Sequence, residues 1–166
     1  MESRAKLFGH PIHQMLVIFP AGLLATSVVF DIVHRASGSQ AMAMVAHYLI
    51  VAGIVGAALA APFGLIDWLS IPRNTRARAL GAWHGSGNLV VVALFVASLL
   101  LRLDAPTAPS WPAQSLSFVG AAVMLVTAWM GGELVDRLGV GICDETGLDA
   151  PSTLRRDLRT QQARGH

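Results

Sequence analysis

The sequence predicts an all-α integral membrane protein, an up-down four-helix bundle with short loops and a polar C-terminal tail. Three observations predict this fold. Hydrophobic residues make up 54% of the 166 residues and charged residues only 13%, whereas an average soluble domain has about 25% charged residues. Four long apolar runs alternate with polar segments, and ten of the twelve lysine and arginine residues fall on one side of the resulting topology.

Each apolar run is long enough to cross a bilayer core of about 30 Å as a helix. We expect the spans at about 11–33, 44–68, 80–101 and 114–135, with a mild kink at Pro20 inside the first. Residues 1–142 then form one transmembrane domain, and residues 143–166 form a polar tail. The single cysteine, Cys143, has no partner for an intrachain disulfide.

The distribution of basic residues predicts the orientation. Four spans place the N-terminus, the loop at 71–79 and the tail on one side, with only Arg35 and Arg102 on the other. The positive-inside rule then places both termini in the cytoplasm. We therefore expect a multi-pass protein embedded in the lipid bilayer.

The first span opens with an unusual pattern, His10-Pro11-Ile12-His13. Pro11 suits the first turn of a helix, because its φ is fixed and it lacks an N–H that would be unpaired there. His10 and His13 are then expected one turn apart on roughly one helix face, at the border of the membrane. Imidazoles at such a depth need water, a polar partner or a ligand.

All four spans bring an ionisable residue to a similar depth. Counted inward from the far ends of the spans, His13, Asp67, His84 and Glu133 lie 17 to 21 residues deep. Helices one and three are diagonal in an up-down bundle, as are helices two and four. His13 and His84 are therefore candidates to face each other, and so are Asp67 and Glu133. The alternative is that these side chains point toward the headgroups, with the carboxylates paired to the arginine-rich loop.

Small and polar residues accompany these candidates. Asn88 shares a helix face with His84, and Gly85 and Gly87 leave space beside it. The second span carries a stripe of small residues, namely Gly53, Ala57, Ala60 and Gly64. Such a stripe admits a closely packed helix or a flat ligand, and close helix packing is the simpler interpretation.

Several motifs together resemble one family of bacterial membrane proteins. They are His10-Pro11-Ile12-His13 followed by Phe19-Pro20, Gly64 with Asp67-Trp68, His84 with Asn88, Trp129-Met130-Gly131-Gly132-Glu133-Leu134-Val135, and Gly139-Val140-Gly141-Ile142. From Phe8 to Ile142 the chain resembles the four-helix proteins of the domain of unknown function 2231 family. The resemblance implies a bacterial inner-membrane location. The association of that family with redox modules, including Rieske-type domains, implies electron transfer by analogy, but no activity is established for it.

Three functions remain open at this point. In the first, which we take as the main hypothesis, His13 and His84 ligate a haem b. His10, Asn88, Gly85 and Gly87 then surround the haem, and loop arginines neutralise its propionates. In the second, His13, His84, Asp67 and Glu133 bind a zinc or iron ion, although the chain lacks the Glu-x-x-His repeats of di-metal bundles. In the third, the protein is a structural or assembly subunit without a cofactor.

The sequence also bounds the partners. A redox partner or a larger membrane complex fits the main hypothesis, and a homo-oligomer remains open. The basic tail lacks the interleaved aromatic residues of a nucleic-acid binder. An enzyme acting on a soluble substrate is not indicated, since Gly85-Ser86-Gly87 lacks both the strand and the lysine of a phosphate-binding loop.

Overall fold

Four helices within the described part of the chain are long and apolar enough to cross a membrane. The computed structural model describes residues 1–143, 146–150 and 152. The candidate spans cover 12–37, 40–70, 76–100 and 111–137, which confirms the predicted four-helix membrane bundle. The helices extend beyond most of the predicted limits, because polar ends such as Arg76–Arg78 are helical too, with the Thr75 side chain accepting a hydrogen bond from the Arg78 N–H.

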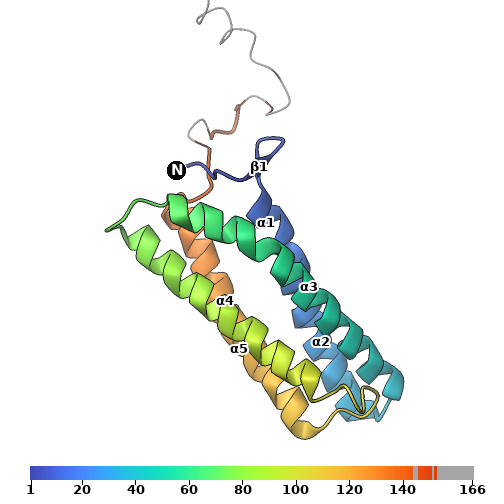
Figure 1. Cartoon of the computed structure of the whole chain (residues 1–166). Helices are drawn as coiled ribbons and strands as arrows, with labels where there is room; N and C mark the ends of the chain where they lie inside the picture. The colour runs from blue at the N-terminus through green and yellow to red at the C-terminus, as the bar shows by residue number, and fades with distance from the viewer. Residues whose placement is uncertain (144–145, 151, 153–166) are drawn as a thin grey trace, which may run out of the picture.

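The elements follow one another in a simple order (Figure 1). They are β1 (Lys6–Leu7), β2 (His10–Pro11), α1 (Ile12–Leu16), α2 (Ile18–Ser37), α3 (Gln40–Ser70), α4 (Arg76–Leu100), α5 (Trp111–Gly132) and the π-helical turn η1 (Glu133–Arg137). Most of the predicted tail, including Arg155, Arg156, Arg159 and Arg164, lies outside the described residues.

The helices form two antiparallel pairs (Figure 1). Helices α1, α2 and α3 make the first hairpin, and α4 and α5 make the second. The near end of the bundle carries Met1, the loop at 71–75 and Gly139, and the far end carries the loops at 38–39 and 101–110. Contacts within each hairpin are much more extensive than contacts between the two hairpins.

Prolines shape the first hairpin. The helix that begins at Ile12 is interrupted at Val17, three residues before Pro20, whose missing N–H cannot bond to the preceding turn. Helix α3 contains Pro62, and its last part leans toward α4 in Figure 1. This lean brings the near end of the first hairpin against the second.

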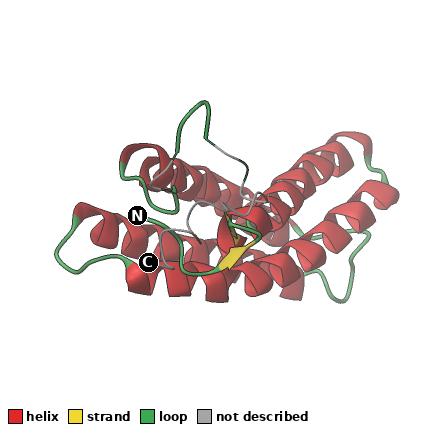
Figure 2. Ribbon diagram, turned by 90° about the horizontal axis from the view of Figure 1, so that it is seen from above, coloured by secondary structure: helices red, strands yellow, loops and turns green. Residues whose placement is uncertain are grey.

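The N-terminal segment differs from the prediction. His10 and Pro11 are not helical but form strand β2, in which His10 pairs with Leu7 of β1 (Figure 2). The two turn residues, Phe8 and Gly9, have φ values of 50° and 85°, as a tight two-residue hairpin requires. His10 and His13 therefore do not share a helix face.

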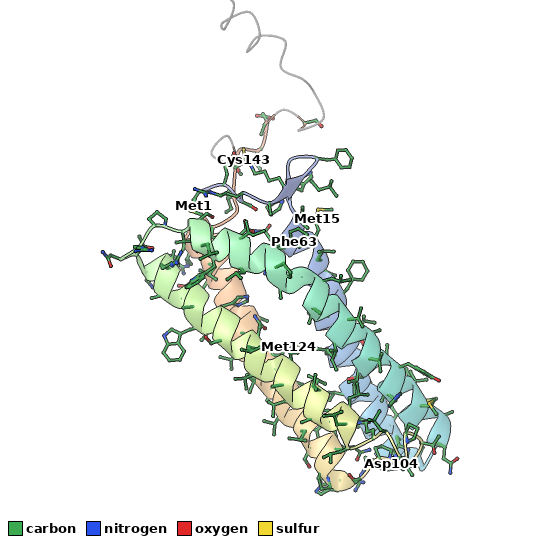
Figure 3. All side chains as sticks on the ribbon, viewed as in Figure 1. Met1, Met15, Phe63, Asp104, Met124 and Cys143 are labelled. Carbon is green, nitrogen blue, oxygen red and sulfur yellow. The ribbon has the colours of Figure 1, made fainter. Side chains whose placement is uncertain are left out.

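The core lies where the two hairpins meet. Leu24, Ile50, Val91 and Phe95 are buried together, and Met124, labelled in Figure 3, packs against them. Large apolar side chains on the outer faces, such as Leu59 and Leu125, are exposed. Such faces are suited to lipid contact.

An ion pair that the sequence analysis missed is buried at the far end. Arg102 donates from Nη1 and Nη2 to the two carboxylate oxygens of Asp31, at 2.7 and 2.6 Å, and both side chains are fully buried. Its Nε also donates to Ser98 Oγ at 3.1 Å, and Nη2 donates to Ser117 Oγ at 3.0 Å. Asp31 comes from α2 and Arg102 follows α4, so this network joins the two hairpins.

A first prediction concerns orientation. In a Cys143→Ser background, single cysteines at Ser39 and Ser110, which lie at the far end, should react with a membrane-impermeant maleimide in intact cells. The exposed native Cys143 should react only after the cells are opened, because the basic near end is expected in the cytoplasm. Labelling of Cys143 in intact cells would show that the orientation is reversed.

A second prediction concerns Gln114, which is fully buried near the start of α5. Neither its amide nitrogen nor its amide oxygen has a hydrogen-bond partner among the described residues. Because an unpaired buried polar group costs about 1–3 kcal/mol, Gln114→Met should leave the melting temperature in detergent unchanged or raise it. Arg102→Met, which strands Asp31, should cost about 3–5 kcal/mol. A large loss with Gln114→Met would instead mean that its amide binds a further polar group.

Candidate functional site

His13 is held by the neighbouring helix of its own hairpin. Its Nδ1 lies 3.1 Å from the carbonyl oxygen of Ala60 in α3. The ring packs on Gly64, where an added Cβ would stand 2.7 Å from His13 Cε1. Because a carbonyl oxygen accepts only, Nδ1 must carry the proton, and Nε2 keeps its lone pair.

His84 is held in the same way in the second hairpin. Its Nδ1 lies 2.9 Å from the carbonyl oxygen of Thr127 in α5, and a Cβ added to Gly131 would stand 3.2 Å from His84 Cε1. The carbonyl again assigns the proton to Nδ1 and leaves the lone pair on Nε2. The two histidines thus come from different hairpins. Each ring contacts a carbonyl oxygen and a glycine of the opposite helix in its own hairpin, α3 for His13 and α5 for His84.

Asn88 completes the surroundings of His84. Its Nδ2 donates to His84 Nε2 at 3.0 Å, and its Oδ1 accepts from Thr127 Oγ1 at 3.0 Å. The predicted shared face of His84 and Asn88 is thus a direct hydrogen bond.

The glycines that flank the histidines are not the ones named from the sequence. Gly85 is exposed, and nothing lies within 4 Å of the Cβ that it lacks. A Cβ on Gly87 would stand 2.5 Å from Thr127 Cγ2, so this glycine admits helix α5. The rings instead lie against Gly64 and Gly131. Gly64 was noted in the small-residue stripe, but its contact with His13 depends on helix rotation, which composition does not reveal.

The two carboxylates have partners away from the histidines. Asp67 accepts hydrogen bonds from Ser3 Oγ at 2.6 Å and from the Arg4 N–H at 3.2 Å. Glu133 forms an ion pair with Arg76, the first residue of α4, at 2.7 Å. The alternative predicted that both carboxylates pair with the arginine-rich loop at 71–79; Glu133 does so through Arg76, whereas Asp67 binds the N-terminal segment instead. Among the described residues, no group of three or more histidine, cysteine, aspartate or glutamate side chains is placed to hold a metal ion.

The remaining histidines lie elsewhere. His10 is exposed in β2 and outside the histidine pair. His34 bonds through Nδ1 to the carbonyl oxygen of Ser39, and His47 has a buried Nδ1 without a hydrogen-bond partner among the described residues. Both lie toward the far end.

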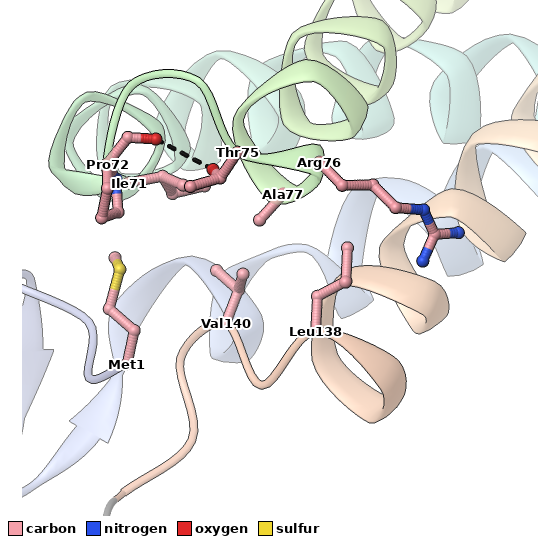
Figure 4. Close-up of a pocket in the computed structure, with 8 residues that line it drawn as sticks. All are labelled: Met1, Ile71, Pro72, Thr75, Arg76, Ala77, Leu138 and Val140. Atoms are coloured by element: carbon pink, nitrogen blue, oxygen red, sulfur yellow. Dashed lines mark hydrogen bonds between the residues drawn. The ribbon is translucent and has the colours of Figure 1, made fainter.

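A cavity of about 300 Å³ lies at the near end (Figure 4). It is formed by the N-terminus, the loop between α3 and α4, and the segment after η1. Its lining residues are Met1, Ile71, Pro72, Thr75, Arg76, Ala77, Leu138 and Val140. Neither His13 nor His84 lines it, so the cavity is separate from the histidine pair.

Comparison with known proteins places the chain in a family. A family model described as "Predicted membrane protein (DUF2231)" matches residues 9–144. The chain belongs to the DUF2231 family. No curated protein and no solved structure was found to match it. The match covers both histidines, both flanking glycines and the ion pair of this DUF2231 protein, but the family description states no activity.

A third prediction tests the glycines that flank the histidines in this DUF2231 protein. Gly64→Ala places a Cβ against the His13 ring and should destabilise the fold by about 1–3 kcal/mol, with a smaller loss for Gly131→Ala, where the gap is wider. Gly85→Ala is the matched control and should cause no loss, because its Cβ meets open space. Thermal unfolding in detergent measures all three. If all three variants melted at the same temperature, Gly64 and Gly131 would have no role in positioning the histidine rings.

Proposed function

We propose that this membrane protein is a haem b-binding electron-transfer subunit, in which His13 and His84 would hold the haem. The observation that carries the proposal is the matched setting of the two rings. Each Nδ1 faces a backbone carbonyl at 2.9–3.1 Å, and each ring lies on a glycine of the next helix. In both rings, Nε2 is therefore the nitrogen with a lone pair to offer.

This arrangement is the one that metal-ligating histidines require. A ligating imidazole almost always donates its other N–H to a carbonyl, carboxylate or water, which fixes the tautomer and makes the ligand more basic. The two glycines keep side-chain bulk away from the rings. A haem held by His13 and His84 through two neutral imidazoles would supply electron transfer.

The position of the pair suits exchange with a partner. His13 is the second residue of the first span and lies near the end of the bundle that carries Met1. Electrons held there are within reach of a redox protein docked on the near end or of a quinone in the bilayer.

One observation favours a second function, that of a cofactor-free subunit. The bond from Asn88 to His84 Nε2 satisfies this imidazole without a ligand. A closed network of this kind stabilises a helix pair by itself. The zinc or iron alternative has no comparable support, because Asp67 and Glu133 bind Ser3 and Arg76 instead.

A fourth prediction separates these functions by the optical spectrum of protein purified after expression with ample haem. The chain should show a six-coordinate, low-spin haem b spectrum. His13→Ala and His84→Ala should each abolish it, while His34→Ala, at the far end, should leave it intact. Asn88→Leu should retain the haem, since Asn88 competes with iron for Nε2.

The contrary outcomes are equally distinct. Colourless protein that contains near-stoichiometric zinc or iron would support the metal-ion function. Colourless, metal-free protein that is destabilised by Asn88→Leu would support the cofactor-free subunit.

A further inference from the structure

The buried faces of α2 and α4 follow one pattern. Counted from His13 and from His84, buried residues follow after 7, 11, 14 and 18 positions. The four pairs at these intervals are Pro20 and Val91, Leu24 and Phe95, Ser27 and Ser98, and Asp31 and Arg102. The last pair is the buried ion pair.

Helices α3 and α5 match in the same way. The reference residues are Ala60 and Thr127, whose carbonyl oxygens hold the two histidines. Buried residues precede them by 7, 10 and 14 positions, and the flanking glycine follows by 4. These pairs are Gly53 and Gly120, Ile50 and Ser117, Ala46 and Ala113, and Gly64 and Gly131.

Helical periodicity explains the intervals within one helix, but it does not explain the register between helices. In the first hairpin, the missing Cβ of Gly53 faces Leu24 at 2.5 Å, and in the second that of Gly120 faces Phe95 at 2.9 Å. These two contacts join matched positions, as do the two bonds from histidine to carbonyl. A buried stripe is common to many helices. Here the two hairpins also share the register between their helices and the histidine bound to a carbonyl, so we treat the hairpins as structurally equivalent.

We propose that the domain is a tandem repeat of one helical hairpin about a pseudo-twofold axis along the membrane normal, and that Asp31 and Arg102 determine how the two hairpins recognise each other. Both repeats start at the near end, so they are parallel repeats of the kind known in membrane transporters. Five of the pairs are identical, namely His13 and His84, Ser27 and Ser98, Ala46 and Ala113, Gly53 and Gly120, and Gly64 and Gly131.

The ion pair lies where such an axis requires. In a twofold interface, a residue that contacts its own equivalent lies on the axis. Asp31 binds Arg102, its equivalent in the other hairpin, so this pair lies at the axis. Two identical charges at the buried position would repel each other, so opposite charges join one hairpin to the other and disfavour pairing of like hairpins.

The repeat predicts which hydrogen-bond acceptors an arginine would find at position 31. Arg102 uses Ser98 and Ser117 as acceptors. After a charge exchange, an arginine at 31 finds the equivalent of Ser98, which is Ser27. It lacks the equivalent of Ser117, because that position is Ile50.

The test is a set of exchanges in the full chain, measured as monodisperse yield and melting temperature in detergent. D31R and R102D alone bury like charges and should lower the melting temperature by roughly 10 °C or more, or abolish the monodisperse peak. The D31R/R102D variant should recover folded protein. Adding I50S/S117I to it should raise the melting temperature again, whereas I50S/S117I in the native background should lower it.

The decisive result is that I50S/S117I raises the melting temperature in the D31R/R102D background and lowers it in the native background. Structural equivalence of the two hairpins predicts this reversal, whereas a local role for each residue does not. Failure of D31R/R102D to fold, or a destabilising effect of I50S/S117I in both backgrounds, would overturn the repeat. These measurements do not depend on haem, so they test the repeat separately from the proposed function.

Discussion

The two hairpins gain little hydrophobic stabilisation from meeting inside a bilayer, since lipid tails are as apolar as the helix surfaces they replace. Polar contacts and close packing must therefore hold them together. The bidentate bond between Asp31 and Arg102 is such a contact, since both side chains are fully buried, and Ser98 and Ser117 each accept a further hydrogen bond from the guanidinium. Because Asp31 and Arg102 come from different hairpins, this contact joins one hairpin to the other at the far end.

The two ends of the bundle thus carry different polar groups. At the far end, the buried network of Asp31, Arg102, Ser98 and Ser117 joins the two hairpins. At the near end, His13 and His84 are oriented by carbonyl oxygens of their own hairpins, so neither ring needs the opposite hairpin to hold its tautomer. Ser3 and Arg76 bind the two border carboxylates. Charged groups at membrane depth are costly, and here each of them is either paired or confined to the border.

Hydropathy and charge were sufficient to predict the four spans, because a bilayer allows few alternatives to a helix. They were not sufficient for the site, since contacts depend on helix rotation. Asp31 and Arg102 lie far apart in the sequence and read as ordinary helix-end charges. Gly85 was named for its proximity to His84 in sequence, whereas Gly131 reaches the ring from another helix. The N-terminal hairpin was missed because its turn uses Phe8 at positive φ, a conformation unusual for a bulky side chain.

The repeat also shows which chemistry differs between the hairpins around the histidines. The position four residues after His84 is Asn88, which bonds to the ring, whereas the same position after His13 is Val17. Thr127, which supports Asn88, corresponds to Ala60. The imidazole, its carbonyl partner and its glycine are thus present in both hairpins, but the polar cover of Nε2 is present in only one. A role in packing alone would not require a histidine where its polar partner is absent. Two histidines that share one ligand would require the imidazole in both hairpins.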